Sequence, residues 1–104
     1  MIDREGIARQ ARVLKALGHP TRVAVLEALR RHGELCVCEL HDFVPGDQST
    51  LSRHLSCLRQ AGLLLERRDG VRVLHRVADA SVYAILDTAA GICRAPRAAA
   101  ELRG

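Results

Sequence analysis

Aromatic residues are almost absent from this 104-residue chain, at 2% of the sequence, and tryptophan is missing altogether. Proteins that bind single-stranded nucleic acid stack its bases on aromatic side chains, so this composition argues against such a partner. Long apolar runs are also lacking, since no stretch approaches the roughly 20 apolar residues that a membrane span requires. The first residues, MIDREGIARQ, have no apolar signal-peptide core. We therefore expect a cytoplasmic protein with no membrane partner.

Cysteine is scarce too, with four residues in the chain. A reducing cytoplasm disfavours a disulfide framework, which leaves metal binding, thiol chemistry or simple packing for these side chains. The sequence has no glycine-rich phosphate loop, no paired-carboxylate cleft and no cysteine–histidine–asparagine arrangement. A chain of this length forms one domain with one core and leaves little room for a substrate pocket. We expect that the protein is not an enzyme.

Positive charge is concentrated in one quarter of the chain. Residues 53–76 contain six arginines against two acidic residues, which accounts for the whole formal net charge of +4. A basic block of this kind is typical of a surface that meets phosphates, and a solvated arginine-rich face is the alternative. The six are Arg53, Arg59, Arg67, Arg68, Arg72 and Arg76.

Two helices are predicted in the N-terminal third. Asp3 can cap a first helix that reaches about Leu17 and ends at Gly18. Pro20 is a favourable first residue for a second helix, which stops near Gly33. Each contains apolar residues at helical spacing. These are Ile7, Ala11, Leu14 and Leu17 in the first helix, and Val23, Leu26 and Leu29 in the second.

A helix-turn-helix is predicted next. The third helix runs from about Cys36 to Phe43, and Asp47 can cap a fourth helix that reaches Ala61. The fourth helix has two faces at helical spacing. The packing face comprises Leu51, Leu55 and Leu58, and the outward face comprises Ser49, Ser52, Arg53 and Ser56.

The outward face of the fourth helix favours DNA contact. Small hydroxyl side chains allow close approach to a major groove, and arginine reads the edges of guanine. A helix that is merely solvated more often carries lysine and glutamate there.

A hairpin follows the fourth helix. Asp69-Gly70 lies between two runs of strand-forming residues, at 63–68 and 71–77, which is a strong hairpin signal. In the second strand Val71, Val73, His75 and Val77 alternate with Arg72, Leu74 and Arg76, so we expect one mostly apolar face.

The whole pattern predicts a mainly α fold with one β-hairpin, a winged helix-turn-helix. A last helix, capped by Asp79, runs to about Ala90. We expect one DNA-binding and dimerisation domain over residues 1–92 and a C-terminal tail over 93–104, which we expect to be flexible.

Three long stretches then identify a family. They are ALGHPTRVAVLEAL, ELCVCEL and QSTLSRHLSCLRQAGLLLERRDGVRVLHRV, which occur in this order within residues 16–77. Together they closely resemble the ArsR/SmtB family of metalloregulatory transcriptional repressors, and within it the arsenic-responsive members. The resemblance implies a homodimer that binds a palindromic operator in double-stranded DNA and blocks transcription until a toxic thiophilic ion releases it.

The resemblance also implies which residues bind DNA and which form the dimer. The DNA-binding residues are Gln48, Ser49, Ser52, Arg53 and His54 on the fourth helix, with Arg67, Arg68 and Arg72 on the wing. The dimer interface is implied to lie on the first and last helices, in agreement with the apolar residues around Leu14 and Ile85.

The ion-binding residues implied by the resemblance are Cys36 and Cys38, with trivalent arsenic or antimony as the inducer. Many arsenic-responsive members carry a third cysteine three residues further on, where this chain has His41. Cadmium and lead sensors use additional cysteines near the N-terminus, and no cysteine precedes residue 36 here. Zinc and nickel sensors use histidines on the last helix, and DASVYAILDTAAGI contains none.

The spacing of the two cysteines has its own physical meaning. Residues one apart in a regular helix point about 200° apart, so one ion cannot be held by both without distortion. Cys36 falls near the N-cap, where the backbone is less constrained and free N–H groups favour thiolates. Spacing alone thus predicts a thiophilic site at a helix start, which excludes magnesium and calcium. We hypothesise that an ion there re-aims the third helix and, through Leu40, Phe43 and Leu55, the fourth.

Several alternatives remain. The cysteines could be small buried packing residues, or a redox switch in which oxidation of the pair or of Cys93 replaces the ion. The inducer could also be cadmium, lead or bismuth. A third ligand could be Cys93, which is the best candidate, or Cys57 with His54 beside it, or water. Finally, the chain could be a small metal carrier or thiol protein, which would not need its arginines.

Overall fold

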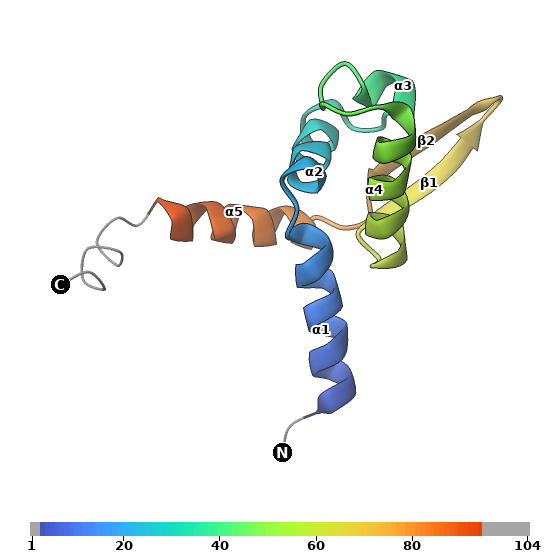
Figure 1. The fold of residues 1–104 in the computed structure, drawn as a ribbon. Helices are drawn as coiled ribbons and strands as arrows, with labels where there is room; N and C mark the ends of the chain where they lie inside the picture. The colour runs from blue at the N-terminus through green and yellow to red at the C-terminus, as the bar shows by residue number, and fades with distance from the viewer. Residues whose placement is uncertain (1–2, 95–104) are drawn as a thin grey trace.

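A computed structural model describes residues 3–94, which form five helices and one two-stranded antiparallel hairpin (Figure 1). The order of elements confirms the predicted winged helix-turn-helix. They are α1 (Arg4–Leu17), α2 (Pro20–His32), α3 (Val37–Leu40), α4 (Gln48–Gln60), β1 (Leu64–Asp69), β2 (Arg72–Val77) and α5 (Ser81–Cys93).

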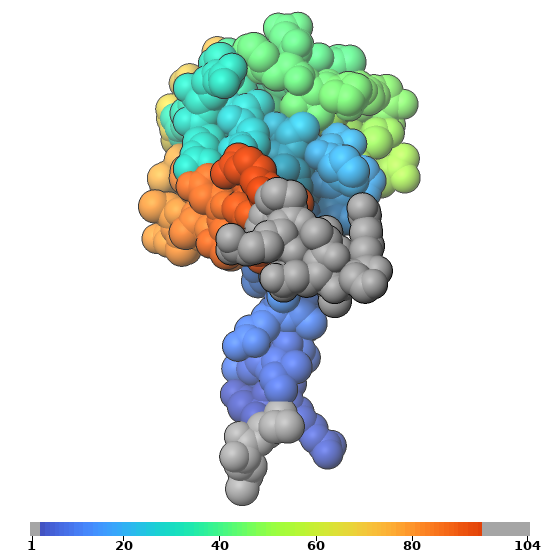
Figure 2. Space-filling view, turned by 90° about the vertical axis from the view of Figure 1, so that its left-hand side faces the viewer, coloured from blue at the N-terminus to red at the C-terminus, as the bar shows by residue number. Residues whose placement is uncertain are grey.

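Two helices extend from the body of the domain. In Figure 1, α1 runs downward and α5 runs to the left, at a wide angle to each other, while α2, α3, α4 and the hairpin gather above them. The space-filling view from the left shows α1 protruding below the rest of the molecule (Figure 2). No helix among residues 3–94 combines the length and apolarity needed to cross a membrane.

The core lies between α2, α3, α4 and the base of the hairpin. The predicted packing face of α4 is confirmed, because Leu51, Leu55 and Leu58 are each at most 2% exposed. They pack with Leu26 and Leu40, which are fully buried. Burying each leucine side chain contributes roughly 1.5–3 kcal/mol of transfer free energy. This packing fixes which side of α4 faces outward.

Capping side chains set the starts of α2 and α4. The Nδ1 atom of His19 accepts a hydrogen bond from the Thr21 N–H at 3.1 Å. Asp47 accepts one from the Thr50 N–H at 2.8 Å. Each bond satisfies a backbone donor that has no partner inside its helix.

The N-cap of α5 is Ala80 rather than the predicted Asp79, although Asp79 accepts a hydrogen bond from the Ser81 N–H at 2.9 Å. The helix continues to Cys93 and so passes the predicted end at Ala90. Cys93, which we expected to begin the tail, is therefore helical. The predicted tail beyond Arg94 lies outside the described residues.

The third helix is shorter than predicted. It begins as expected after Cys36 but ends at Leu40, and residues 41–43 form a turn. The prediction that Phe43 packs α3 against α4 is wrong. Its ring is 50% exposed and stacks on His32 of α2, with the ring centroids 4.2 Å apart.

The hairpin turns one residue later than predicted. Asp69 pairs with Arg72, so the two-residue loop is Gly70-Val71 rather than Asp69-Gly70. Gly70 has φ +64°, the left-handed region that a type II′ turn requires of its first loop residue. Val71, expected on the apolar face, is consequently 98% exposed at the tip.

A short backbone pairing joins the hairpin to the segment before α3. Leu35 forms an antiparallel bridge with His75, in which the two residues exchange N–H···O bonds of 3.1 and 2.8 Å. Sequence periodicity gave no sign of a single bridging residue. This bridge places Cys36 directly beside the second strand.

Candidate DNA interface and thiol site

The outward face of α4 contains four of the five side chains expected to read DNA. Gln48, Ser49, Ser52 and Arg53 are exposed, at the N-terminal half of the helix. Arg53 forms no salt bridge with any described residue, although its charge helps to lower the pKa of Asp47, after the hydrogen bonds that this carboxylate accepts. An uncommitted guanidinium among small side chains is suited to contact base edges or phosphates.

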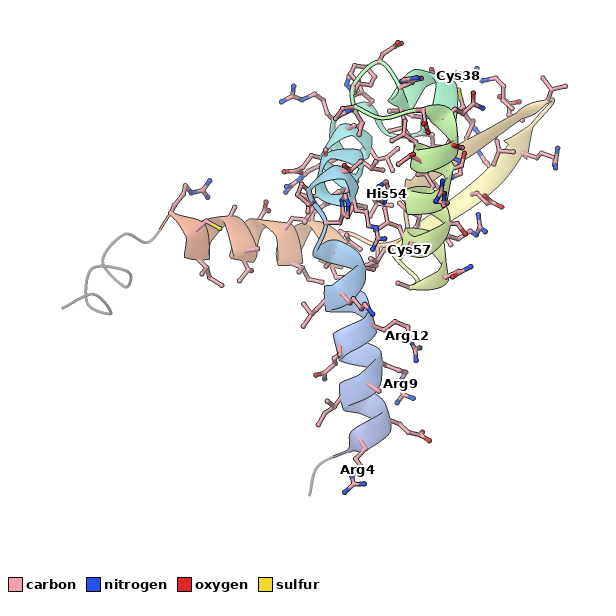
Figure 3. All side chains as sticks on the ribbon, in the orientation of Figure 1. Arg4, Arg9, Arg12, Cys38, His54 and Cys57 are labelled. Atoms are coloured by element: carbon pink, nitrogen blue, oxygen red, sulfur yellow. The ribbon has the colours of Figure 1, made fainter. Side chains whose placement is uncertain are left out.

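His54 differs from the other four. It is half-buried and its Nδ1 atom accepts a hydrogen bond from Nε of Arg22 at 3.0 Å. Its ring centroid lies 4.4 Å from that of His19. Burial lowers the pKa of His54, and the neighbouring charges of His19, Arg22 and Arg53 lower it further. Figure 3 shows His54 between α2 and α4, so its contacts hold the two helices together. A DNA contact by His54 stays a prediction.

The wing, which we define as residues 64–77, contains four arginines, and the three that we expect to contact DNA are in different states. Arg67 donates two close hydrogen bonds to Glu34, at 2.9 and 2.8 Å, and this contact lowers the pKa of Glu34. Arg72 pairs with Glu39. Arg68 is exposed and forms no salt bridge within residues 3–94. Only one of the three expected DNA contacts on the wing is thus uncommitted.

The two cysteines of interest lie at the start of α3. Cys36 is the N-cap and has extended backbone angles, as expected for a residue not yet helical. Its N–H donates to the Glu39 carboxylate at 3.0 Å, and its sulfur accepts a long hydrogen bond from Arg72 Nη2 at 3.7 Å. Cys36 is buried, whereas Cys38 is exposed and lies at the top of the molecule in Figure 3.

The binding of one thiophilic ion by both sulfurs of this pair stays a prediction. Both sulfurs are free thiols, and the backbone of Cys36 is extended rather than helical. Within residues 3–94, no group of three or more histidine, cysteine or acidic side chains is arranged to hold a metal ion. The described residues therefore offer no third protein ligand beside Cys36 and Cys38.

The other two cysteines lie elsewhere. Cys93 ends α5, which points away from α3 within one protomer (Figure 1). Cys57 is partly buried beside a cleft of about 270 Å³ that it shares with basic residues of α1 and α2. Its neighbour His54 is engaged by Arg22, and the two do not belong to a larger ligand cluster among the described residues.

An apolar groove separates α1 from α5. It has a volume of about 400 Å³, and two of its side chains are conspicuously exposed, Leu14 at 61% and Ile92 at 72%. The lining residues are Leu14, Ala84, Ile85, Thr88, Ala89 and Ile92. The predicted interface residues of the first and last helices therefore meet on one surface.

Comparison with known proteins identifies the family. Residues 19–65 match the model of a family described as bacterial regulatory protein, arsR family. The chain is 34% identical over 82 residues to a helix-turn-helix transcriptional regulator of Methanocaldococcus jannaschii, a match that covers 79% of this chain and 92% of that one. The chain belongs to the ArsR family.

Other members of the ArsR family share both sequence and fold with the chain. An arsenic resistance regulator of Pseudomonas putida is 45% identical over 65 residues, 62% of this chain and 51% of that protein. A cadmium resistance regulator homologue of Staphylococcus aureus is 34% identical, over 76% of this chain and 65% of that protein. The chain thus spans about half the length of the arsenic regulator and about two thirds of the cadmium one.

The fold of a solved ArsR-family relative agrees with the element order described above. The homodimeric winged helix-turn-helix DNA-binding domain of a possible ArsR-family regulator of Mycobacterium bovis superimposes with a TM-score of 0.75 at 30% identity, over 88% of each chain. The resemblance inferred from the sequence is confirmed at the level of family and fold. Members of this family are DNA-binding transcriptional regulators, so at family level the chain is a regulator and not an enzyme.

Proposed function

We propose that the protein is a cytoplasmic transcriptional repressor that binds a palindromic operator as a homodimer and is released by trivalent arsenic or antimony bound at Cys36 and Cys38. One observation carries this proposal. The thiol pair begins α3, the helix that packs directly against the recognition helix α4 through Leu40 and Leu55. An ion that alters the start of α3 therefore acts on the DNA-binding surface.

The DNA-binding half of the proposal rests on α4 and the wing. Gln48, Ser49 and Ser52 are small or flexible polar side chains beside the uncommitted Arg53. In such a helix the arginine and glutamine contact base edges, while the serines permit close approach to the groove. Arg68 supplies a phosphate contact from the wing, so binding weakens as salt rises.

The inducer part of the proposal rests on the affinity of thiolates for soft ions. The thiols of Cys36 and Cys38 each give a proton to a departing hydroxide of arsenous acid, so two As–S bonds replace two As–O bonds and two waters leave. An ion held in this way favours the arrangement of α3 that brings both sulfurs to it. Because that arrangement binds DNA less well, the ion lowers operator affinity by differential binding.

Arsenic prefers three thiolates, so a third donor completes the site or a hydroxide remains. Cys93 is the candidate we favour, supplied by the second protomer, because it is exposed at the end of a helix that lines the dimer groove. This assignment is separate from the assignment of the pair.

The homodimer part of the proposal rests on the groove between α1 and α5. A monomer rarely leaves side chains such as Leu14 and Ile92 exposed together on one apolar surface without a partner. The Mycobacterium bovis relative forms a homodimer, which supports a second copy as the occupant.

The test is fluorescence anisotropy with an operator duplex from the protein's own promoter, under reducing conditions, with and without arsenite. We expect arsenite to release the wild type but neither Cys36→Ser nor Cys38→Ser, and Cys93→Ser to report whether the third ligand is Cys93. Binding that arsenite leaves unchanged would contradict the inducer assignment while leaving the repressor assignment intact.

Cadmium is a second candidate inducer, because the chain is similar to a cadmium resistance regulator as well as to arsenic regulators. The same assay therefore includes cadmium, lead, bismuth and an oxidant. A metal carrier that uses the same thiols would not bind duplex DNA in a salt-dependent way. If salt-dependent duplex binding is lost when Arg53 and Arg68 are replaced, the protein is not a metal carrier of this kind.

A further inference from the structure

The wing is attached to the thiol segment, which we define as residues 34–40, by three separate contacts, besides a long ion pair of 3.9 Å between Arg76 and Glu34. Arg67 pairs with Glu34, and Arg72 pairs with Glu39 while also donating to the Cys36 sulfur. The third contact is the backbone bridge between Leu35 and His75. All three lie outside the packing of α3 on α4. The thiols therefore have a direct connection to the wing that does not pass through the recognition helix.

Among these contacts, the one made by Arg72 is the one that involves the Cys36 thiol itself. Its guanidinium lies 3.7 Å from the Cys36 sulfur and bonds the carboxylate of Glu39, which in turn accepts the Cys36 N–H. The three residues thus form a closed set of contacts at the N-cap of α3. These contacts raise the pKa of Arg72, so the side chain is charged at any physiological pH.

We propose that Arg72 is a positioning residue of the inducer response, which holds the wing in its DNA-binding orientation through Cys36 and Glu39 and loses the sulfur when Cys36 binds a thiophilic ion. This inference rests on the proposed function, because it requires an ion at Cys36. It assigns to Arg72 a structural role in the ion-free protein in place of the direct DNA contact that the resemblance implied.

The chemistry of the sulfur explains why the contact is lost. A free thiol sulfur has lone pairs that accept a hydrogen bond from a guanidinium. An ion shared with the exposed Cys38 requires the buried Cys36 sulfur to turn outward, which carries its lone pairs away from the Arg72 guanidinium. Arg72 is 49% exposed on its side chain, so water can replace the sulfur as its partner.

The effect on DNA follows from the position of Arg72. It pairs with Asp69 across the turn of the hairpin, next to the two-residue loop, so a change in its partners acts at the tip of the wing. Arg68, one residue before Asp69, is the uncommitted arginine of the wing within residues 3–94. Loss of the Arg72 contacts therefore shifts Arg68, the arginine that we expect to contact phosphate.

The two arginines give a matched pair of variants, Arg72→Gln and Arg68→Gln. Anisotropy is measured at several salt concentrations without arsenite and then at one salt concentration with arsenite. A residue that contacts one phosphate contributes about 1 to the slope of log affinity against log salt. We expect Arg68→Gln to lower this slope by about 1 and to leave the ratio of affinities without and with arsenite as in the wild type.

For Arg72→Gln we expect the opposite result. The salt slope stays that of the wild type, while the ion-free affinity falls severalfold toward that of the arsenite-bound protein, so the ratio shrinks. Glu39→Gln weakens the same contact while every cysteine and every residue of the wing keeps its identity, and it shrinks the ratio in the same direction. Arg72→Lys keeps the charge but cannot contact both partners in the same geometry, and it restores the ratio only in part.

Two results would overturn the inference. One is a slope for Arg72→Gln that falls by about 1 with an unchanged arsenite ratio, because Arg72 would then be a phosphate contact. The other is a wild-type ratio in Glu39→Gln. Failure of the proposed function looks different, since arsenite would then leave the wild type itself on DNA. Titration of free thiols with and without arsenite records ion binding independently of DNA in every variant.

Discussion

Arg30 on α2 and Asp87 on α5 form a two-bond ion pair, with both N···O distances at 2.7 Å. The same guanidinium lies over the ring of Tyr83 at 4.8 Å. The pair lowers the pKa of Asp87 and links the body of the domain to the helix whose other side lines the apolar groove. It therefore helps to set the angle of α5, the helix on which we propose that a second protomer packs.

Replacing Arg30 with glutamine tests this role. We expect a small loss of thermal stability, because exposed ion pairs contribute little, together with a severalfold weaker dimer, since α5 is less firmly oriented. Sedimentation equilibrium gives the dimer dissociation constant. Arg31→Gln, on the same helix and without an ion pair among residues 3–94, is the control. A dimer unchanged in Arg30→Gln would show that packing alone orients α5.

The apolar groove provides a stronger test of the dimer. Leu14→Asp places a charge on a surface that we expect the second protomer to cover, so it favours the monomer and abolishes tight operator binding. Leucine burial is worth roughly 1.5–3 kcal/mol at each of two symmetric positions. Glu5→Ala, on the exposed opposite side of α1, should leave the dimer intact. Light scattering distinguishes the two outcomes, and a dimeric Leu14→Asp would place the interface elsewhere.

The packing face of α4 determines the stability of the domain. Leu58 is fully buried, and Leu58→Ala should lower the free energy of unfolding by about 2–5 kcal/mol, through lost transfer free energy and a residual cavity. Urea denaturation followed by circular dichroism measures this change. The exposed Leu65 is the matched control, and Leu65→Ala should cost far less. Equal losses at the two positions would mean that the core is arranged differently.

The burial of two histidines predicts how the free energy of unfolding depends on pH. Burial lowers the pKa of both His75 and His54 below the value near 6.5 expected in the unfolded chain. Around His75, Glu66 opposes this lowering and Arg59 adds to it. As pH falls through 6.5 the unfolded chain takes up protons before the folded one does. The free energy of unfolding therefore decreases from pH 7.5 toward pH 5.

Urea midpoints at pH 7.5 and pH 5.5 test this prediction. The difference between them should shrink in His75→Gln, because the variant no longer has the titrating group. His41→Gln, in the exposed turn after α3, should keep the wild-type difference. Stability that rises on acidification would contradict the assignment of His75 as a buried neutral side chain.

Much of the fold could be predicted because local signals and packing agree. The leucines of α4 recur at helical spacing and are buried as expected, and Asp47 caps the helix where the sequence predicts. The turn of the hairpin was misplaced by one residue because Asp-Gly and Gly-Val are both plausible loops. Only cross-strand pairing of Asp69 with Arg72 decides between them.

The candidate site was predictable in its residue types but not in its contacts. The expected positions of Cys36 at an N-cap and of Arg53 on an outward face agree with the structure. The partners of Arg67 and Arg72 could not be inferred, because Glu34 and Glu39 are more than thirty residues away in sequence. Likewise, helical spacing placed His54 beside Cys57 but could not indicate that Arg22 engages it from α2.

The bridge at Leu35 and the cap at Asp47 fix the two ends of the segment that contains the thiols. Between them lie α3 and a turn, held to the rest of the domain by the buried Leu40 and Val44 and by the contacts of Cys36 and Glu39 with Arg72. Such a segment can be exchanged as a unit. Ligand residues grafted into positions 36–43, with both buried side chains kept, should change the chemical signal that the protein detects while the DNA sequence it recognises stays the same.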